Sequence, residues 1–505
     1  MTAPPTIPAP RPDELAAAAQ QLSFDLDTRA LGEFGALMQG LIADVNLIDS
    51  LTAPTLPVSY PRPAPRRPDA AENPWNAWTW QCTIAGASSG RLAGKRIVIK
   101  DNIAVAGLPM LNGSKIYEGF VPDEDATVVT RVLDAGGTIL GKATCENFCL
   151  SGGSHTSATG PVRNPRNPAY MTGGSSSGCA ALIVAGECDM GIGSDQGGSV
   201  RMPASFSGCV GIKPSYGLVP YTGAGPIEQT IDHLGPMAAS SADCALLLEV
   251  IAGYDDGRDP RQNVGLTPKP YTALLAEGVR GLRIGLLREG FGTPGAEADV
   301  DALVRSAAGR LADAGAVVEE VSVPMHAQGG SIMLTSSLDG MLSTFTELGP
   351  LGPNPRGHAL LGAIRFYQEV RRARANDMPV TVKTVLLCAQ VMRNRYGPYY
   401  SAKAQNLVRS LRGAYDAAFA HYDLIAMPTT PMKAHLIPPP DASPAVVLGN
   451  AFDMIGNTAP FDVTGHPSLS VPAGLSNGLP VGLMLTGRYG EDDVVLRAGH
   501  AFEQL

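Results

Sequence analysis

Two short stretches of the chain combine serine and glycine in a pattern that is typical of reactive sites. They are residues 172–178 (TGGSSSG) and residues 193–201 (GSDQGGSVR). A serine hydroxyl is a weak nucleophile and needs a base next to it. The glycine-flanked serines allow three interpretations: a phosphate-binding loop, a hydrolase with a histidine base, and a serine nucleophile that is activated without histidine.

The first two interpretations fit the sequence poorly. Gly191-x-Gly193-x-x-x-Gly197 has one residue too many for a dinucleotide fingerprint, and no Gly-Lys-Ser/Thr follows it. Residues 174–178 formally match a nucleophile elbow with Ser176 as the nucleophile, but that motif needs a strand directly before it, and residues 164–168 (NPRNP) are typical of a turn. Later histidines keep this alternative open, namely His233, His435, His466 and His500.

The third interpretation needs a base other than histidine, and a neutral lysine can serve. Burial in apolar surroundings favours the neutral form of a lysine, so such a residue is expected on a hydrophobic strand. Lys100 fits, because the run Arg96–Lys100 (RIVIK) predicts a strand that ends on it. Taken alone, Lys100 also fits a structural lysine that pairs with the neighbouring Asp101.

The spacing of three residues resembles a known family. Lys100, Ser175 and Ser199 are separated by 75 and 24 positions, as in the amidase signature family. The joint pattern Gly-Gly-Ser-Ser-Ser-Gly and Asp-x-Gly-Gly-Ser-x-Arg-x-Pro-Ala is highly specific. The resemblance covers residues 73–505, is weakest across 326–400, and also includes the stretches 208–214 (GCVGIKP), 427–431 (MPTTP) and 465–474 (GHPSLSVPAG).

Within that family, the chain looks like the broad-specificity amidases that are often found beside nitrile hydratases. The likeness rests on residues 195–199 (DQGGS), 218–223 (LVPYTG) and 231–236 (IDHLGP), together with a helical N-terminal extension. The resemblance implies an α/β amidase-signature fold, with a mixed, mostly parallel sheet that is covered by helices.

The resemblance also implies a role for each residue of the two stretches. Ser199 would be the nucleophile, Ser175 a bridging serine after a cis peptide bond, and Lys100 the base. The backbone N–H groups around Ser199 would form the oxyanion hole, in residues Gln196, Gly197, Gly198 and Ser199 itself. Four further residues would support the site, namely Gly174, Ser176, Asp195 and Arg201.

The implied function is hydrolysis of linear amides to the acid and ammonia or an amine, through an acyl-enzyme and without a metal or organic cofactor. A specialist carbamate or anilide hydrolase would use the same three residues. The A subunit of a tRNA-dependent amidotransferase shares the core, but we expect Asp-Thr there in place of Asp195-Gln196. A binding protein without catalytic activity is disfavoured, because the Lys–Ser–Ser set is intact.

Substrate recognition is predicted outside the motifs. Residues 326–400 break the rhythm of strands and helices, with Gly/Pro-rich loops at 348–357 and a basic helical stretch at 365–374. Variable loops on a rigid scaffold often carry recognition, and the apolar residues of this segment are candidates to wall a pocket: Met333, Leu334, Leu338, Met341, Leu342, Phe345, Phe366 and Tyr367. His155, which departs from the family pattern, is a further candidate, either for the leaving group or as a hydrogen-bonding residue nearby.

The elements that must position these residues follow from the hydrophobic pattern. Strands alternate with helices of ten or more residues from residue 90 onward, which indicates an α/β fold. We expect strands at 96–100, 138–140, 189–193, 282–287, 317–321, 423–426, 468–471 and 481–485. We expect helices at 126–135, 179–185, 296–312 and 492–504.

The N-terminal part of the chain has a different composition. Residues 13–48 show helical periodicity, and residues 54–68 hold six prolines together with Arg62, Arg66 and Arg67. Proline fixes φ and lacks an N–H donor, so this stretch predicts an extended, solvated arm. The sequence therefore divides into a helical segment with an arm at 1–72 and a catalytic domain at 73–505.

Composition limits the partners. The chain has 505 residues, with 38 Lys and Arg against 47 Asp and Glu and a net charge of −9, which argues against nucleic acid or an anionic membrane. No apolar run reaches the ~18 residues of a membrane span, and the N-terminus shows no secretory signal. Eight scattered cysteines are expected to be buried thiols in a reducing, cytoplasmic compartment. The expected partner is a small-molecule amide, and a homodimer is compatible with the sequence.

Overall fold

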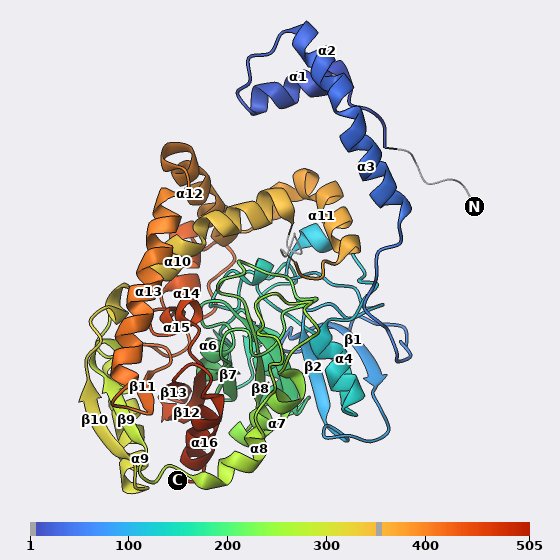
Figure 1. Cartoon of the computed structure of the whole chain (residues 1–505). Coiled ribbons are helices and arrows are strands. Elements are labelled where there is room, and N and C mark those ends of the chain that lie inside the picture. Colours follow the sequence, from blue (N-terminus) through green and yellow to red (C-terminus); the bar gives the residue numbers. More distant parts are fainter. Residues whose placement is uncertain (1–6, 350–355) are drawn as a thin grey trace. The chain divides into compact units, whose positions relative to one another are not determined.

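The computed structural model describes residues 7–349 and 356–505. The chain forms two compact units, one that extends to Leu56 and one that comprises Pro57–Leu505 (Figure 1). The second unit holds both serine stretches and the predicted base.

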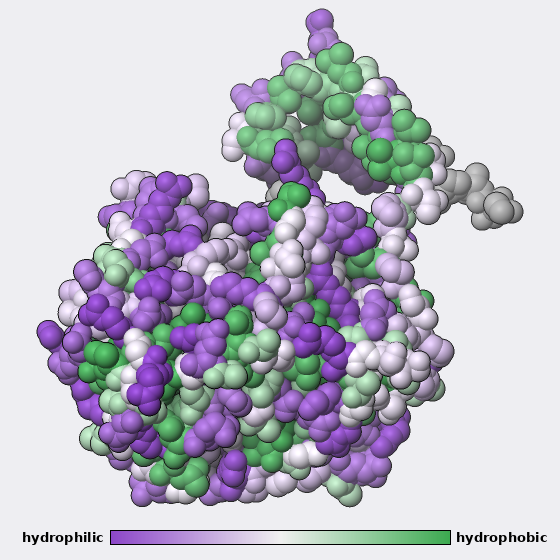
Figure 2. All heavy atoms as spheres, turned by 60° about the horizontal axis from the view of Figure 1, so that its bottom comes forward, coloured by the Kyte–Doolittle hydropathy of each residue, from purple (hydrophilic) through white to green (hydrophobic). Residues whose placement is uncertain are grey.

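The N-terminal unit consists of three helices, α1 (Pro12–Gln21), α2 (Thr28–Leu37) and α3 (Gln39–Ser50), and it confirms the predicted helical periodicity. Among its described residues only Ala19 and Leu56 are buried. Figure 2 shows hydrophobic side chains gathered on the visible face of this unit. The exposed apolar residues include Leu22, Phe24, Phe34, Leu37, Leu41, Val45, Leu47, Ile48 and Leu51.

The arm is not a solvated linker along its whole length. Arg62 forms an ion pair with the buried Asp125. Arg66 forms an isolated bridge with Gln81 through its backbone, with N···O distances of 2.9 Å in both directions. The Arg67 guanidinium lies 4.7 Å from the ring centroid of Trp80. The three arginines therefore attach this part of the arm to the second unit, which explains why that unit begins at Pro57.

An eleven-stranded mixed sheet forms the centre of the second unit, in the order β1-β3-β2-β6-β8-β7-β12-β13-β11-β9-β10. All eight predicted strands are present, as β2 (Arg96–Lys100), β3 (Thr138–Ala143), β6 (Met190–Asp195), β9 (Arg283–Leu287), β10 (Val317–Val321), β11 (Leu424–Pro428), β12 (Ser468–Ser476) and β13 (Leu479–Gly487). The sequence prediction missed three strands of this sheet, namely β1 (Trp78–Ala85), β7 (Val210–Lys213) and β8 (His233–Ala238).

The predicted α/β fold with a mixed sheet is confirmed, and the two kinds of pairing occupy different places. The strands β3, β2 and β6 pair in parallel, as do β11, β9 and β10. The pairings from β6 to β11, and that of β1 with β3, are antiparallel, so antiparallel pairs are more numerous than expected. The hairpin of β12 and β13 shows one cause: Asn477 and Gly478 both have positive φ, which a two-residue turn of this type requires.

Helices cover the sheet. The predicted helices are found as α4 (Thr127–Asp134), α5 (Ser177–Val184), α9 (Ala298–Asp313) and α16 (Asp492–Glu503). Further helices are α6 (Arg201–Ser207), α7 (Ser241–Ile251), α8 (Tyr271–Leu274), α13 (Tyr399–Phe419), α14 (Pro444–Phe452) and α15 (Ala459–Thr464). Among the described residues, no helix is long and apolar enough to span a membrane.

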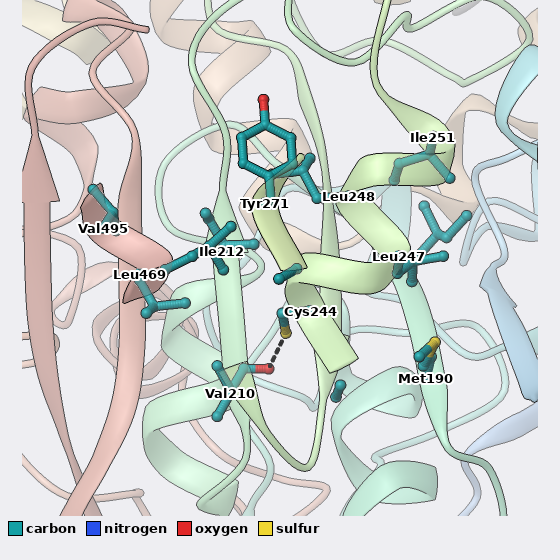
Figure 3. Packing of buried hydrophobic residues seen from close by; sticks show 14 of the residues in the cluster. Met190, Val210, Ile212, Cys244, Leu247, Leu248, Ile251, Tyr271, Leu469 and Val495 are labelled. Atoms are coloured by element: carbon teal, nitrogen blue, oxygen red, sulfur yellow. Dashed lines mark hydrogen bonds between the residues drawn. The ribbon is translucent and has the colours of Figure 1, made fainter. Parts of the chain in front are cut away.

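The main core lies between the sheet and these helices. Figure 3 shows α7 packed on the strands through Cys244, Leu247 and Leu248, opposite Ile212 of β7. The Cys244 thiol donates to the Val210 carbonyl at 3.8 Å. The buried apolar face of α7 thus fixes the middle of the sheet, from which the strands β6 and β2 continue.

The segment 326–400 is more helical than expected. It contains α10 (His326–Ser343), a π-helical turn at Thr344–Leu348, α11 (Leu361–Arg374) and α12 (Val380–Tyr396). The loops predicted at 348–357 lie mostly outside the described residues. The basic stretch 365–374 is the second part of α11, whose arginines complement the C-terminal end of the helix dipole.

Candidate active site

The predicted base and the predicted bridging serine lie together. Lys100 ends β2 and is fully buried, and its Nζ lies 2.7 Å from Ser175 Oγ. Ser175 follows Gly174 through a cis peptide bond, as the resemblance implied. Gly174 has no room for a side chain, because a Cβ there would collide with the Gly153 carbonyl oxygen.

Ser194 fixes the position of the lysine amine. Because β2 and β6 are parallel neighbours, Lys100 and Ser194 come to the same end of the sheet. Lys100 Nζ donates to Ser194 Oγ at 2.9 Å and to the Ser194 carbonyl at 3.2 Å. Asn102 Nδ2 donates to the same hydroxyl at 3.2 Å. The amine is therefore held between Ser194 on β6 and the Ser175 hydroxyl.

The structural alternative for Lys100, a pair with Asp101, is wrong. Asp101 Oδ2 accepts the Leu111 N–H at 3.0 Å, and its Oδ1 lies 3.8 Å from Nζ of Lys142, a second buried lysine on β3. Burial raises the pKa of Asp101 to about 7, against the opposing charge of Lys142. Asp101 is next to Lys100 in the sequence but therefore pairs with Lys142 in the structure.

Ser199, the predicted nucleophile, lies in the loop between β6 and α6 and is 5% exposed. The Ser176 N–H donates to the Ser199 carbonyl at 3.2 Å, so the two serine stretches are directly joined. Ser176 itself is fully buried and its hydroxyl donates to the Ser194 carbonyl at 3.2 Å. Ser176 is thus a supporting residue, and the elbow with Ser176 as nucleophile is not supported.

Asp195 and Arg201 brace this loop from within. Asp195 Oδ2 accepts the Val200 N–H at 3.0 Å and the Arg201 Nε–H at 3.0 Å. Arg201 also donates from Nη2 to Asp462 at 2.7 Å and from Nη1 to the Thr458 carbonyl at 2.9 Å. Asp195, Arg201 and Asp462 are all fully buried, so this ion-pair cluster is shielded from solvent.

The two carboxyl groups of this cluster differ in the direction of their pKa shifts. Burial alone would raise the pKa of Asp195, but the Arg201 guanidinium holds it well below its ordinary value. Burial and the neighbouring Asp195 raise the pKa of Asp462 well above its ordinary value. The Arg201 guanidinium therefore favours the charged form of Asp195 more strongly than that of Asp462.

The predicted oxyanion hole needs one correction. The Gly198 N–H donates to Asp195 Oδ1 at 2.5 Å, so the carboxylate holds this N–H in place. Gly198 is needed for the conformation of the loop instead, because its φ is +128° and a Cβ there would collide with the Thr458 hydroxyl. Gln196, Gly197 and Ser199 line the cavity and remain the candidate donors. The Gln196 side chain is held by Tyr221, to whose phenol oxygen its Nε2 donates at 2.7 Å.

A cavity of about 320 Å³ opens onto Ser199. The walls come from the loops that carry Ser151 and Ser199 and from helices α10, α12 and α14. Most of the lining is apolar: Leu150, Met202, Ile227, Ile231, Met333, Leu334, Leu338, Met341, Val385, Leu448, Phe452 and Ile455. Polar lining comes from Ser151, Gln196, Ser199, Ser337 and Thr384. The cavity suits a neutral ligand with an apolar group.

The predicted substrate-binding residues divide into two groups. Met333, Leu334, Leu338 and Met341 line the cavity from α10. Phe345 does not, because it is fully buried and its ring lies 5.0 Å from that of Phe148. Leu342, Phe366 and Tyr367 do not line the cavity either. Phe345, Phe366 and Tyr367 belong to a hydrophobic cluster that also contains Met341 and Leu338, so they pack behind the lining residues. His155 is also outside the lining, and its Nε2 donates to the Val447 carbonyl at 3.1 Å.

Two walls of the cavity were missed by the sequence prediction. One wall belongs to α14 and the other to α12, and neither helix carries a motif that marks it as part of a site. The residues concerned are Leu448 and Phe452 on α14 and Thr384, Val385 and Cys388 on α12.

Cys388 also corrects the expectation of buried cysteines, because it is exposed whereas the other seven are buried. Residues 7–349 and 356–505 hold no group of three or more His, Cys, Asp or Glu side chains that could bind a metal ion.

Comparison with known proteins agrees with the geometry. The protein-family model described as Amidase matches residues 67–496. The chain is 42% identical over 504 residues to an enantioselective amidase of Rhodococcus rhodochrous, and the match covers 98% of this chain and 95% of that protein. It is 37% identical over 422 residues to a glutamyl-tRNA(Gln) amidotransferase subunit of Methanosarcina mazei, which covers 82% of this chain and 85% of that protein.

Solved structures show the same fold. The corresponding glutamyl-tRNA(Gln) amidotransferase subunit from Thermotoga maritima superposes with a TM-score of 0.69 at 30% identity, over 83% of this chain and 85% of that chain. A bacterial aryl acylamidase of the amidase signature family superposes with a TM-score of 0.69 at 27% identity, over 82% and 83% of the two chains.

Proposed function

The chain belongs to the amidase signature family, and on this premise we propose that it hydrolyses carboxylic amides through a serine acyl-enzyme. The observation that carries the proposal is the contact of 2.7 Å between Lys100 Nζ and Ser175 Oγ, in a site where Ser199 faces an apolar cavity. The products are the carboxylic acid and ammonia or an amine.

The proposed mechanism is a proton relay. Neutral Lys100 takes the proton of the Ser175 hydroxyl, and Ser175 takes the proton of Ser199 as the Ser199 oxygen attacks the amide carbonyl carbon. The backbone N–H groups of Gln196, Gly197 and Ser199 stabilise the oxyanion of the tetrahedral intermediate. The proton returns through Ser175 to the leaving nitrogen, the C–N bond breaks, and water then hydrolyses the acyl-enzyme.

Two other activities use the same relay and are outcomes of a substrate panel. A carbamate or anilide hydrolase would share every residue named above, and the likeness to an aryl acylamidase favours including anilides in that panel. An amidotransferase role is less well supported, because the match to the enantioselective amidase extends over 98% of this chain, including the N-terminal unit, and the match to the amidotransferase protein covers 82%.

The cellular compartment and the partners of the enzyme are part of the proposal. All eight cysteines are free, which supports a reducing, cytoplasmic compartment. A small-molecule amide is the proposed partner, and a homodimer stays a prediction.

The experiment that tests the function is trapping of the acyl-enzyme. The purified protein should release ammonia from benzamide and, with hydroxylamine present, form the hydroxamate from the same intermediate. The Ser199→Ala variant should do neither, whereas Ser240→Ala, which changes only the N-cap of α7, should do both. Benzamide turnover by a folded Ser199→Ala protein at the wild-type rate would contradict the proposal.

A further inference from the structure

We propose that His155 is a positioning residue that anchors helix α14 and so fixes one wall of the substrate cavity. The proposal rests on the proposed amide hydrolysis for its effect on substrates. Of the two roles that the sequence left open for His155, contact with the leaving group or hydrogen bonding nearby, it takes the second and gives His155 a part in shaping the acyl pocket.

Helix α14 is a surface helix that depends on few contacts. Of its nine residues, Pro444–Phe452, only Ala451 is buried. It nevertheless supplies Leu448 and Phe452 to the cavity, and Figure 1 shows it below α12, the helix that supplies the neighbouring wall. A helix with so little buried area has little packing energy to hold it, so specific hydrogen bonds weigh more in its position.

Two of these bonds come from a single loop. The Gly152 N–H donates to the Ala451 carbonyl at 2.7 Å, and His155 Nε2 reaches the Val447 carbonyl at 3.1 Å. Both carbonyls belong to α14, one turn apart. The loop and the helix approach closely because the loop carries glycine: a Cβ on Gly153 would lie 3.0 Å from the Asn450 carbonyl oxygen and 2.5 Å from His155 Nδ1.

The geometry also defines the direction of the histidine hydrogen bond. A carbonyl oxygen only accepts, so His155 must carry a proton on Nε2 to bind Val447. Its Nδ1 is buried and has no hydrogen-bond partner among the described residues. His155 therefore acts here through one N–H donor.

The same loop is tied to the catalytic serine. The Gly152 carbonyl accepts the Gly174 N–H at 2.7 Å, directly before the cis bond to Ser175. Glu146 accepts the backbone N–H of His155 at 3.3 Å, and the Glu146 N–H donates to the Ser175 carbonyl at 3.2 Å. The loop thus connects Ser175 to α14, and His155 is the side chain that completes the connection on the side of the helix.

The first test is hydrogen exchange of the resting enzyme, which needs no substrate. His155→Ala should raise the exchange rate of the amides of residues 444–452 by about tenfold or more, because the helix loses an anchor. His155→Gln should restore most of the protection, since the Gln amide nitrogen reaches nearly as far as Nε2. The control is His421→Ala, an exposed histidine outside α14. Wild-type exchange of α14 in His155→Ala would overturn the proposal.

The second test uses kinetics with a bulky and a small amide. His155→Ala should raise KM for 2-phenylpropionamide by about tenfold and leave KM for propionamide and both kcat values within about threefold. Leu448→Ala should have a similar effect, and the double variant should be no worse than either single variant, because both act on one wall. An equal loss of kcat for both amides in His155→Ala would show action at Ser175 or on the leaving group and would overturn the proposal.

The two tests separate failure of this inference from failure of the proposed function. If the wild-type protein releases no ammonia from any amide, the proposed function fails, and hydrogen exchange still decides whether His155 anchors α14. If amides are hydrolysed but α14 does not respond to His155, the anchoring role alone fails.

Discussion

The Lys100 amine lies 2.7 Å from the Ser175 hydroxyl, although 75 positions separate the two residues in the sequence. The contact arises because Lys100 ends β2 and Ser175 precedes α5, which packs on β6, the parallel neighbour of β2. Parallel strands bring their carboxyl ends to one edge, which gathers the relay in a single place.

The relay predicts non-additive losses of activity. Ser199→Ala should abolish turnover, and Lys100→Ala or Ser175→Ala should lower kcat by about three orders of magnitude or more, since each residue is a link in one proton transfer. The double variant Lys100→Ala/Ser175→Ala should be little worse than either single variant. Steady-state kinetics on folded proteins checks this, and a near wild-type kcat for Lys100→Ala would refute the mechanism.

The ion-pair cluster predicts a loss of stability. Arg201→Met should leave Asp195 buried without a cation and destabilise the protein by about 3–5 kcal/mol. The loop that carries Ser199 should lose activity as well, because Asp195 would no longer be held. Urea unfolding with activity measured at low urea provides the check. Arg305→Met, at an exposed pair with Glu320, is the control and should change the unfolding free energy by less than about 1 kcal/mol.

Asp232 predicts a dependence of stability on pH. Burial raises the pKa of Asp232 to about 8, against the opposing charge of Arg261. The folded protein therefore binds this proton more tightly than the unfolded chain. The contribution of Asp232 to stability is greatest below the unfolded pKa and is lost as pH rises from about 4 toward 8.

Asp232→Asn removes this titration. The stability of the variant relative to the wild type should increase with pH by up to about 1.4 kcal/mol for each unit in that window and stay constant above it. Urea unfolding at pH 5, 6.5 and 8 measures the difference. A difference that does not change between pH 5 and 8 would contradict the raised pKa.

Two adjacent residues of helix α10 are expected to affect different properties, one the substrate specificity and the other the stability. Met341 lines the cavity, whereas Leu342, the next residue, is buried and does not line it. Met341→Ala should change the ratio of kcat/KM between benzamide and propionamide by about tenfold, equivalent to ~1.4 kcal/mol. Leu342→Ala should cost about 2–5 kcal/mol of stability and leave that ratio unchanged. If both variants keep the wild-type ratio of kcat/KM for the two amides, recognition of the acyl group must depend on other residues.

Gly198 predicts a strict requirement for glycine. Its φ of +128° is accessible to glycine, and an added Cβ would meet Thr458. Gly198→Ala should lower kcat by about two orders of magnitude by moving the neighbouring N–H donors. The matched change at Gly309, an exposed helical position with open space around it, should leave kcat unchanged. An active Gly198→Ala enzyme would show that the loop tolerates a shift.

The sequence was sufficient for the elements with strong local signals. The run Arg96–Lys100 and the serine stretches predict the strand, the base and the reacting serines from residue type and spacing, and the family resemblance supplies their roles. The strand β7 was missed because it has only four residues, and β8 because Gly235 and Pro236 interrupt its apolar run, which argues against a central strand.

The walls of the cavity were harder to predict for a different reason. Met341 and Leu342 are adjacent apolar residues on one helix, and the direction in which each points depends on how α10 packs, which no local pattern contains. His155 and Val447 are 292 positions apart, and their contact depends on the close approach that Gly153 permits. Such relationships come from the tertiary structure alone.

The chain leaves the sheet after β10, forms the helices α10 to α13, and returns to the sheet at β11, and β10 and β11 are the two neighbours of β9 at one edge. The residues of the relay are on β2 and in the loops around α5 and β6, in the other half of the sheet. The excursion between β10 and β11 is therefore a module with closely spaced attachment points. An exchange of this module would replace the walls that α10 and α12 give to the cavity and leave the strands and loops of the proposed relay in place.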